Sequence, residues 1–168
     1  MTAGLAAAPE YGAIKQITCL GLGSPCQCAA ARVQLALVPI LRQLFPAVER
    51  VICCDPVLTA ADREILQQFD CVMLQDESAA RVIKDAVLLY MPHCEAALYN
   101  DVLDDNWRPE TLEGVVLLGN SLSAIAVRRL SAAHADGKGH SATTCALSCA
   151  IDRCLNALQI MAHLSVAH

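Results

Sequence analysis

Glycine and polar residues gather directly after four of the short apolar runs in this sequence, and their types are those that bind ligands or take part in catalysis. They form four clusters: Gly21-Leu22-Gly23-Ser24, Asp55-Pro56, Tyr90-Met91-Pro92-His93-Cys94 and Gly119-Asn120-Ser121. If the apolar runs are parallel strands, the clusters meet at one edge of a sheet. Open α/β sheets bind their ligands at this carboxyl edge. The sequence therefore predicts a small-molecule pocket built from clusters that lie far apart in the chain.

The first cluster resembles the start of a dinucleotide-binding fingerprint, although Cys26 stands where the third glycine would be. Two explanations fit Gly21 and Gly23. In one, the turn lets the backbone and Ser24 approach a ligand, and the N–H groups at the start of the next helix face an anion. In the other, the glycines only permit a tight turn between a strand and a helix.

The second and fourth clusters offer hydrogen-bonding groups to a ligand. Asp55 closes an apolar run, where an acidic residue often binds ribose hydroxyls, but it could equally be a turn residue before Pro56. Asn120 and Ser121 could bind a ligand or cap the following helix. Ser121 lacks the Gly-x-Ser-x-Gly elbow, which argues against a hydrolase.

His93 and Cys94 are the candidates for catalysis in the third cluster. His93 could act as an acid or base near neutral pH, and Cys94 could be a nucleophile if a positive field lowers its pKa. The pair could also bind a metal or heme iron together with Cys53, Cys54 or Asp55, or could simply begin a helix and pack beneath it. The sequence contains no Cys-x-x-Cys pair, so a zinc site of the usual spacing is not expected.

The elements that position these clusters alternate between strands and helices. Strands are predicted over residues 14–23, 51–54, 71–74, 86–91 and 114–118, and helices over residues 29–45, 59–69, 78–83, 93–103, 121–133 and 144–166. Near-continuous apolar runs are typical of strands that are buried on both faces. We therefore expect a three-layer, Rossmann-like α/β sandwich with a mostly parallel sheet of at least five strands and helices on both faces.

The helix over residues 29–45 has the clearest periodicity. Its apolar residues follow helical spacing and are predicted to face the core: Val33, Leu37, Ile40, Leu41 and Leu44. Pro39 is expected to kink this helix and Pro46 to end it. Thr59 is predicted to cap the next helix, with Asp62 in its first turn. A polar turn is expected around Trp107, which could pack onto the domain or face a partner.

Length and charge exclude several classes of protein. The 168 residues suit one domain, predicted over residues 14–168 after a flexible tail over residues 1–13. The net charge is -5, and no basic cluster exceeds Arg128-Arg129, so nucleic acid is not expected as a partner. The two most apolar stretches, 29–45 and 144–166, carry charged residues, so no membrane span is expected.

Cysteine content indicates the compartment. The chain has 10 cysteines, many of them inside apolar runs, where cysteine behaves as a small apolar residue. A chain of this size needs no disulfide framework, which indicates a reducing compartment, the cytoplasm or the nucleus. The first ten residues lack the basic start of a signal peptide.

Several of these motifs resemble the sensitivity-to-red-light-reduced-like family. The resemblance rests on Gly21-Leu22-Gly23-Ser24 followed by Ala31-Arg32-Val33-Gln34-Leu35-Ala36, then Cys54-Asp55-Pro56-Val57-Leu58-Thr59, Tyr90-Met91-Pro92-His93-Cys94, Leu98-Tyr99, Asn106-Trp107 and Gly119-Asn120-Ser121. It implies a regulatory protein, because the family is linked to red-light signalling and circadian rhythm in plants, and elsewhere to heme biosynthesis. It brings no agreed reaction, so the motif residues are candidate site residues without chemical roles.

Four functions therefore remain open. The first is a regulatory domain that binds a nucleotide-like or anionic ligand through Gly21, Gly23, Ser24, Asp55, Asn120 and Ser121, with His93 nearby. The second is a methyltransferase-like enzyme with His93 as base. The third is a heme or metal sensor that uses His93 and Cys94. The fourth is a protein–protein adaptor with a vestigial pocket, since protein partners are expected for a regulatory protein.

Overall fold

The computed structural model describes residues 14–121. The chain divides into two compact units, Met1–Gly119 and Asn120–His168, and the sheet and helices below belong to the first unit. The predicted tail over residues 1–13, the predicted helices after Ser121, and Cys145, Cys149 and Cys154 lie outside the described residues. The single domain over residues 14–168 stays a prediction.

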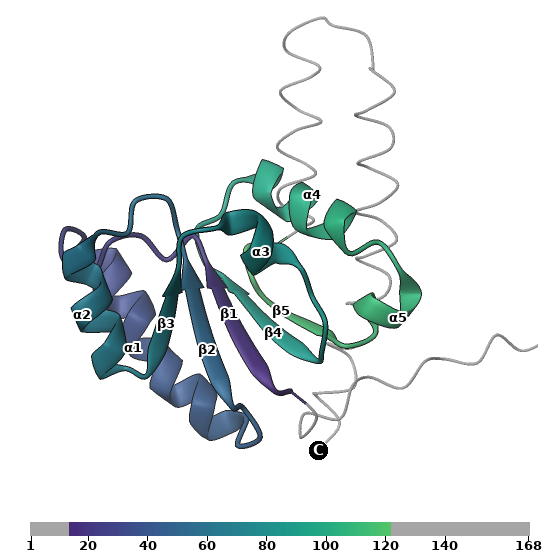
Figure 1. Cartoon of the computed structure of the whole chain (residues 1–168), viewed down its shortest axis with the longest axis horizontal. Helices are drawn as coiled ribbons and strands as arrows, with labels where there is room; N and C mark the ends of the chain where they lie inside the picture. Colours follow the sequence, from purple (N-terminus) through teal and green to yellow (C-terminus); the bar gives the residue numbers. More distant parts are fainter. Residues whose placement is uncertain (1–13, 122–168) are drawn as a thin grey trace, which may run out of the picture. The chain divides into compact units, whose positions relative to one another are not determined.

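A five-stranded, fully parallel sheet forms the centre of the first unit, in the strand order β3-β2-β1-β4-β5. Its strands are β1 (Gln16–Leu20), β2 (Arg50–Cys54), β3 (Cys71–Leu74), β4 (Val87–Met91) and β5 (Val115–Gly119). Figure 1 shows the strands side by side. All five residues of β4 are buried, as expected of a central strand in a parallel sheet. The predicted α/β fold with a parallel sheet is confirmed.

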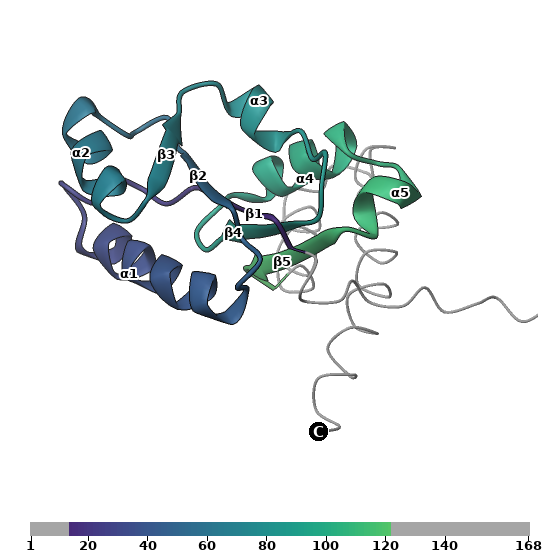
Figure 2. The ribbon, with the colours of Figure 1, turned by 60° about the horizontal axis from the view of Figure 1, so that its bottom comes forward.

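Helices cover both faces of this sheet. They are α1 (Ala29–Leu44), α2 (Ala60–Gln68), α3 (Glu77–Arg81), α4 (Ala96–Asp105) and α5 (Pro109–Leu112). Figure 2 shows α1 on one side of the sheet and α3 and α4 on the other. The main core lies under α1 and α2, where Leu35, Val38 and Leu66 pack against strand residues such as Cys53 and Tyr90.

The core-facing side of α1 differs from the predicted one. Val33 is 73% exposed and Leu44 is 64% exposed, and Ile40 is half exposed. Of the predicted residues, Leu41 is buried and Leu37 packs against the core, and the other buried residues of the helix are Ala31, Gln34, Leu35 and Val38. The prediction was wrong because α1 is apolar almost all round, so periodicity alone offered two competing faces. The helix runs through Pro39 and ends at Leu44, one residue before the C-cap Phe45.

Two valines on α1 provide a matched test of this correction. Val38→Ala is expected to lower the free energy of unfolding by about 2 kcal/mol, because a buried side chain leaves a cavity in the core. Val33→Ala makes the same chemical change on the exposed face and is expected to change stability by less than about 0.5 kcal/mol. Urea unfolding of both variants measures the difference. A larger loss for Val33→Ala would restore the face predicted from periodicity.

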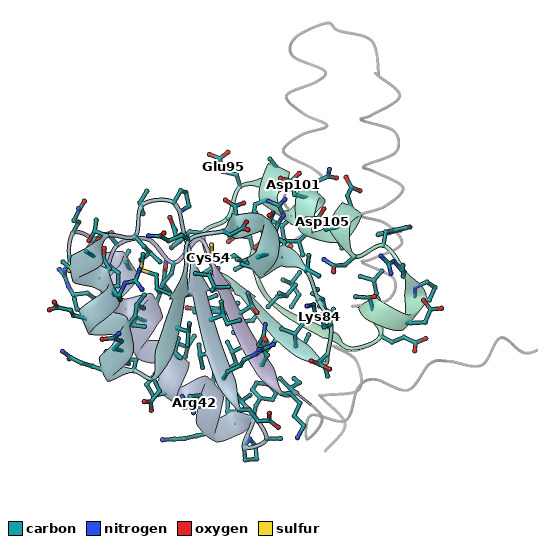
Figure 3. The ribbon with its side chains drawn as sticks, viewed as in Figure 1. Arg42, Cys54, Lys84, Glu95, Asp101 and Asp105 are labelled. Carbon is teal, nitrogen blue, oxygen red and sulfur yellow. The ribbon has the colours of Figure 1, made fainter. Side chains whose placement is uncertain are left out.

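The helices on the other face are joined through two polar residues. Asn106 is buried, and its side chain bonds the backbone of Arg81, Ile83 and Val102. The Arg81 guanidinium pairs with Glu77 and with two carboxylates of α4, Asp101 and Asp105, which are labelled in Figure 3. Asn106 therefore ties the end of α4 to the segment after α3. The next residue, Trp107, is 43% exposed.

Helix boundaries after β4 also differ from the prediction. Helix α4 begins at Ala96 rather than at residue 93, and it continues to Asp105 into the segment predicted as a polar turn. Helix α5 was not predicted. Pro109 stands in its first turn, a position that proline favours, and this was the available signal.

Candidate functional site

The strand order creates a reversal between β1 and β4. The chain runs from β1 outward to β2 and β3, and then returns to pair β4 with the other side of β1. Ligands of open α/β sheets bind outside the carboxyl ends of the strands at such a reversal. The loops after β1, β2 and β4 follow the strand ends at the top of Figure 1. They carry Gly21, Gly23, Asp55, His93 and Cys94, so the first three predicted clusters share this edge.

The loop after β1 depends on the conformational freedom of glycine. Gly21 and Gly23 both have positive φ, at 66° and 76°. A Cβ added to Gly21 would lie 2.6 Å from the Cys94 sulfur, too close for a side chain. Gly21 therefore lets the loop after β4 pack against the end of β1. This role concerns packing and turn geometry, and it holds whether or not a ligand binds.

Asp55 links the loops after β1 and β2. One carboxylate oxygen accepts a hydrogen bond from the Gly23 N–H at 2.8 Å, and the other accepts one from the Val57 N–H at 2.9 Å. The residue is only partly buried. Asp55 thus acts as a turn residue, which was one of its two predicted roles. Its carboxylate also lies directly beside the glycine loop. Each oxygen keeps capacity for a further hydrogen bond from a ligand.

Asp62, three residues after the N-cap Thr59, accepts more hydrogen bonds than the other site carboxylate, Asp55. It is fully buried and accepts hydrogen bonds from the Ser24 hydroxyl, the Cys26 N–H and both the N–H and the hydroxyl of Thr59, at 2.8–2.9 Å. Burial alone would raise the pKa of the Asp62 carboxyl, but these bonds outweigh it and hold the pKa well below its usual range. Asp62 therefore fastens the loop after β1 to the start of α2.

Sequence reasoning placed Asp62 only in the first turn of a helix and missed its bonds to the loop. The available signal was local. Thr59 and Asp62 stand three apart and form a reciprocal capping box, as such pairs do at helix starts. The contacts of Asp62 with Ser24 and Cys26 span 38 and 36 residues, which no local pattern predicts.

Cys94 is buried and its thiol donates a hydrogen bond to the Leu20 carbonyl oxygen at 3.1 Å. Burial, followed by the charges of Asp55 and Glu77, raises the pKa of Cys94 to about 12. The sulfur therefore stays protonated at neutral pH, which is unfavourable for a nucleophile. His93 beside it is exposed. The predicted catalytic roles of these two residues stay predictions, and packing is the role that the contacts of Cys94 support.

The other predicted metal ligands lie at the end of β2. Cys53 and Cys54 are buried, and burial raises the pKa of Cys54 to about 11. Figure 3 labels Cys54 at this strand end. Within residues 14–121, no group of three or more His, Cys, Asp or Glu side chains is arranged to hold a metal ion. Across the same residues, no helix is long and apolar enough to cross a membrane.

Cys28, at the start of α1, is expected to be the more reactive of two exposed cysteines in the loop. The N–H groups of Ala31 and Ala30, with a smaller effect of Arg32, lower the pKa of Cys28. Partial desolvation and the Asp62 carboxylate raise the pKa of Cys26. Iodoacetamide at pH 7 is therefore expected to modify Cys28 several-fold faster than Cys26, because the thiolate is the reacting form.

Mass spectrometry of the two cysteines in timed samples measures this difference, with Cys26 as the internal reference. Arg32→Gln is expected to slow the modification of Cys28 only modestly, since the helix N–H groups contribute more. Faster modification of Cys26 would contradict the prediction.

Asn120 and Ser121 follow β5 in the chain and belong to the second compact unit. Asn120 is partly buried and Ser121 is exposed. Their ligand-binding role stays a prediction. The last residue of β5, Gly119, has its own packing role, because an added Cβ would meet the Tyr99 hydroxyl and, at 2.8 Å, the Met91 carbonyl oxygen.

The chain is similar in sequence to a known protein family and to several known proteins. The SRR1 domain model matches residues 2–159. The Arabidopsis thaliana protein SENSITIVITY TO RED LIGHT REDUCED 1 is 35% identical over 108 residues, which cover 63% of this chain and 39% of the relative. SRR1-like proteins of Drosophila melanogaster and Mus musculus are 33% and 32% identical, over 67% of this chain and 41% and 47% of the relatives.

The chain thus spans less than half the length of these relatives. No solved structure matches it. The SRR1 model covers most of the sequence, including every candidate site residue from Gly21 to Ser121. The chain belongs to the SRR1 family.

Proposed function

We propose that this protein is a regulatory SRR1-family protein that binds a small, nucleotide-like ligand outside the carboxyl ends of β1 and β4. The observation that carries the proposal is the position of the Asp55 carboxylate. It is held against the Gly23 N–H beside the point where the strand order reverses. Doubly wound sheets bind nucleotides at this point and use an acidic residue after the second strand to hold the ribose.

The regulatory part of the proposal rests on the family. The relative from Arabidopsis thaliana is named for reduced sensitivity to red light, which is a signalling property. A signalling protein that changes its state with a ligand needs a pocket, and the reversal point is the natural place for one. Links to heme biosynthesis and to circadian rhythm belong to the same proposal and come from the family resemblance.

Thermal unfolding with added compounds tests the proposal. The protein is mixed separately with adenosine, adenosylmethionine, nicotinamide nucleotides and heme, each at saturating concentration. At least one compound is expected to raise the unfolding temperature in the wild type and to lose this effect in Asp55→Asn. The matched control is Asp76→Asn, which alters another carboxylate at a strand end, the N-cap of α3. No shift with any compound would contradict ligand binding.

Exposed Trp107 supports a second candidate function, that of an adaptor for protein partners. A tryptophan that is 43% exposed is a typical anchor at protein interfaces. In this case Trp107→Ala is expected to abolish rescue of a deletion strain, whereas Asp55→Asn and His93→Ala are expected to leave it intact. The opposite pattern would favour the ligand site.

A further inference from the structure

Five hydrogen-bond donors in the loop after β1 bond acceptors within the protein, where a phosphate-binding loop would present such donors to the anion. In phosphate-binding loops, backbone N–H groups of the glycine turn and of the helix start point at the anion. Here the Gly23 N–H donates to Asp55, and the Cys26 N–H and the Ser24 hydroxyl donate to Asp62. The N–H groups of Gln27 and Cys28 donate to the Ser24 carbonyl oxygen, at 3.1 and 2.9 Å.

The carboxylates of Asp55 and Asp62 therefore already accept the hydrogen bonds for which an incoming anion would have to compete. A phosphate at Gly23 would displace Asp55 and would lie beside its negative charge, which is unfavourable. Arg32, in the first turn of α1, donates a hydrogen bond to the Pro25 carbonyl oxygen at 2.9 Å.

The carboxylates of Asp55 and Asp62 differ in how many further hydrogen bonds they can accept from a ligand. Asp62 is fully buried, and its two oxygens share the Ser24 hydroxyl and accept three further hydrogen bonds from Cys26 and Thr59, so it is closed to a ligand. Asp55 is partly exposed, and each of its oxygens carries one of the hydrogen bonds described above. A carboxylate has about four acceptor positions, so Asp55 can accept hydroxyl donors.

We infer that the ligand presents hydroxyl groups rather than phosphate to this edge, as an unphosphorylated nucleoside does. This inference rests on the proposed function, since it names the ligand class of the same site. The ribose diol donates to Asp55, while the loop from Gly23 to Cys28 supplies shape without binding an anion. The site therefore prefers a nucleoside to its 5′-monophosphate.

Isothermal titration of the wild type with matched pairs tests this preference. The probes are adenosine, guanosine, cytidine and uridine, each compared with its 5′-monophosphate at the same ionic strength. At least one nucleoside is expected to bind about tenfold or more tightly than its monophosphate, and its 2′,3′-dideoxy form is expected to bind at least about tenfold more weakly. Asp55→Asn is expected to weaken binding of the nucleoside and to reduce the difference in affinity between the nucleoside and its monophosphate. Asp76→Asn is expected to change neither the affinity nor this difference.

The outcomes separate this inference from the proposed function. A monophosphate that binds as tightly as its nucleoside, or a dideoxy form that binds equally well, would overturn the hydroxyl preference and leave a ligand site standing. Binding of no nucleoside and no monophosphate would overturn the inference, and a thermal shift with the other compounds would then decide the proposed function. The dideoxy comparison uses the wild type, so the test holds even if Asp55→Asn fails to fold.

Discussion

Asp62→Ala is expected to lower the free energy of unfolding by about 3–5 kcal/mol. The change removes a buried carboxylate that accepts hydrogen bonds from the buried Ser24 hydroxyl and from the part-buried N–H groups of Cys26 and Thr59. Each buried donor left without a partner costs about 1–3 kcal/mol. Urea unfolding followed by circular dichroism measures the loss.

Glu64→Ala is the matched control, because Glu64 lies two residues later on α2 and is exposed. It is expected to change stability by less than about 0.5 kcal/mol. Equal effects of the two variants would show that the carboxylate of Asp62 does not hold the loop.

The low pKa of Asp62 also predicts the direction of the pH dependence. The unfolded chain has an Asp pKa of about 3.9, and the folded value lies below it. The folded state therefore binds fewer protons, so its extra stability is fully present above about pH 4 and is lost as the pH falls further. Asp62→Asn is expected to be less stable at pH 7 and to show a flatter decline below pH 4.

The fold was predictable where local chemistry and periodicity agree. The runs that became β1, β2, β3, β4 and β5 are apolar, short and bounded by glycine, proline or polar residues, so their positions followed from composition. The cap at Thr59 was predictable for the same reason, since it depends on residues only three apart. The face of α1 was not, because Val33 and Val38 are equally apolar and only the tertiary contacts choose between them.

The sequence predicted which loops meet at the carboxyl edge of the sheet, but it did not predict the hydrogen bonds between them. Because β2 and β4 both pair with β1 in parallel, the loops that carry Gly23, Asp55 and Cys94 follow adjacent strand ends. Which carboxylate accepts which N–H depends on contacts across 32 to 38 residues. Sequence reasoning therefore left open whether the N–H groups of the glycine loop face a ligand or only form a tight turn, whereas the structure shows that Asp55 and Asp62 accept hydrogen bonds from Gly23 and Cys26.

Gly21→Ala is expected to lower the free energy of unfolding by about 2–4 kcal/mol. A φ of 66° costs a residue with a side chain about 1–2 kcal/mol, and the new methyl group would overlap the Cys94 sulfur at 2.6 Å. The sulfur would have to move and would lose its hydrogen bond to the Leu20 carbonyl oxygen. The same denaturant titration measures this loss.

The double variant Gly21→Ala/Cys94→Ala separates the two causes. Removing the sulfur makes room for the methyl group, so the double variant is expected to be about 1 kcal/mol more stable than the sum of the single effects predicts. The backbone strain stays, because the φ of residue 21 does not depend on Cys94. If the stability losses of the two single variants simply add, the methyl group does not clash with the Cys94 sulfur, and Cys94 is not the reason why residue 21 must be glycine. A coupling of this size would show that the Cys94 side chain packs against residue 21 at the end of β1.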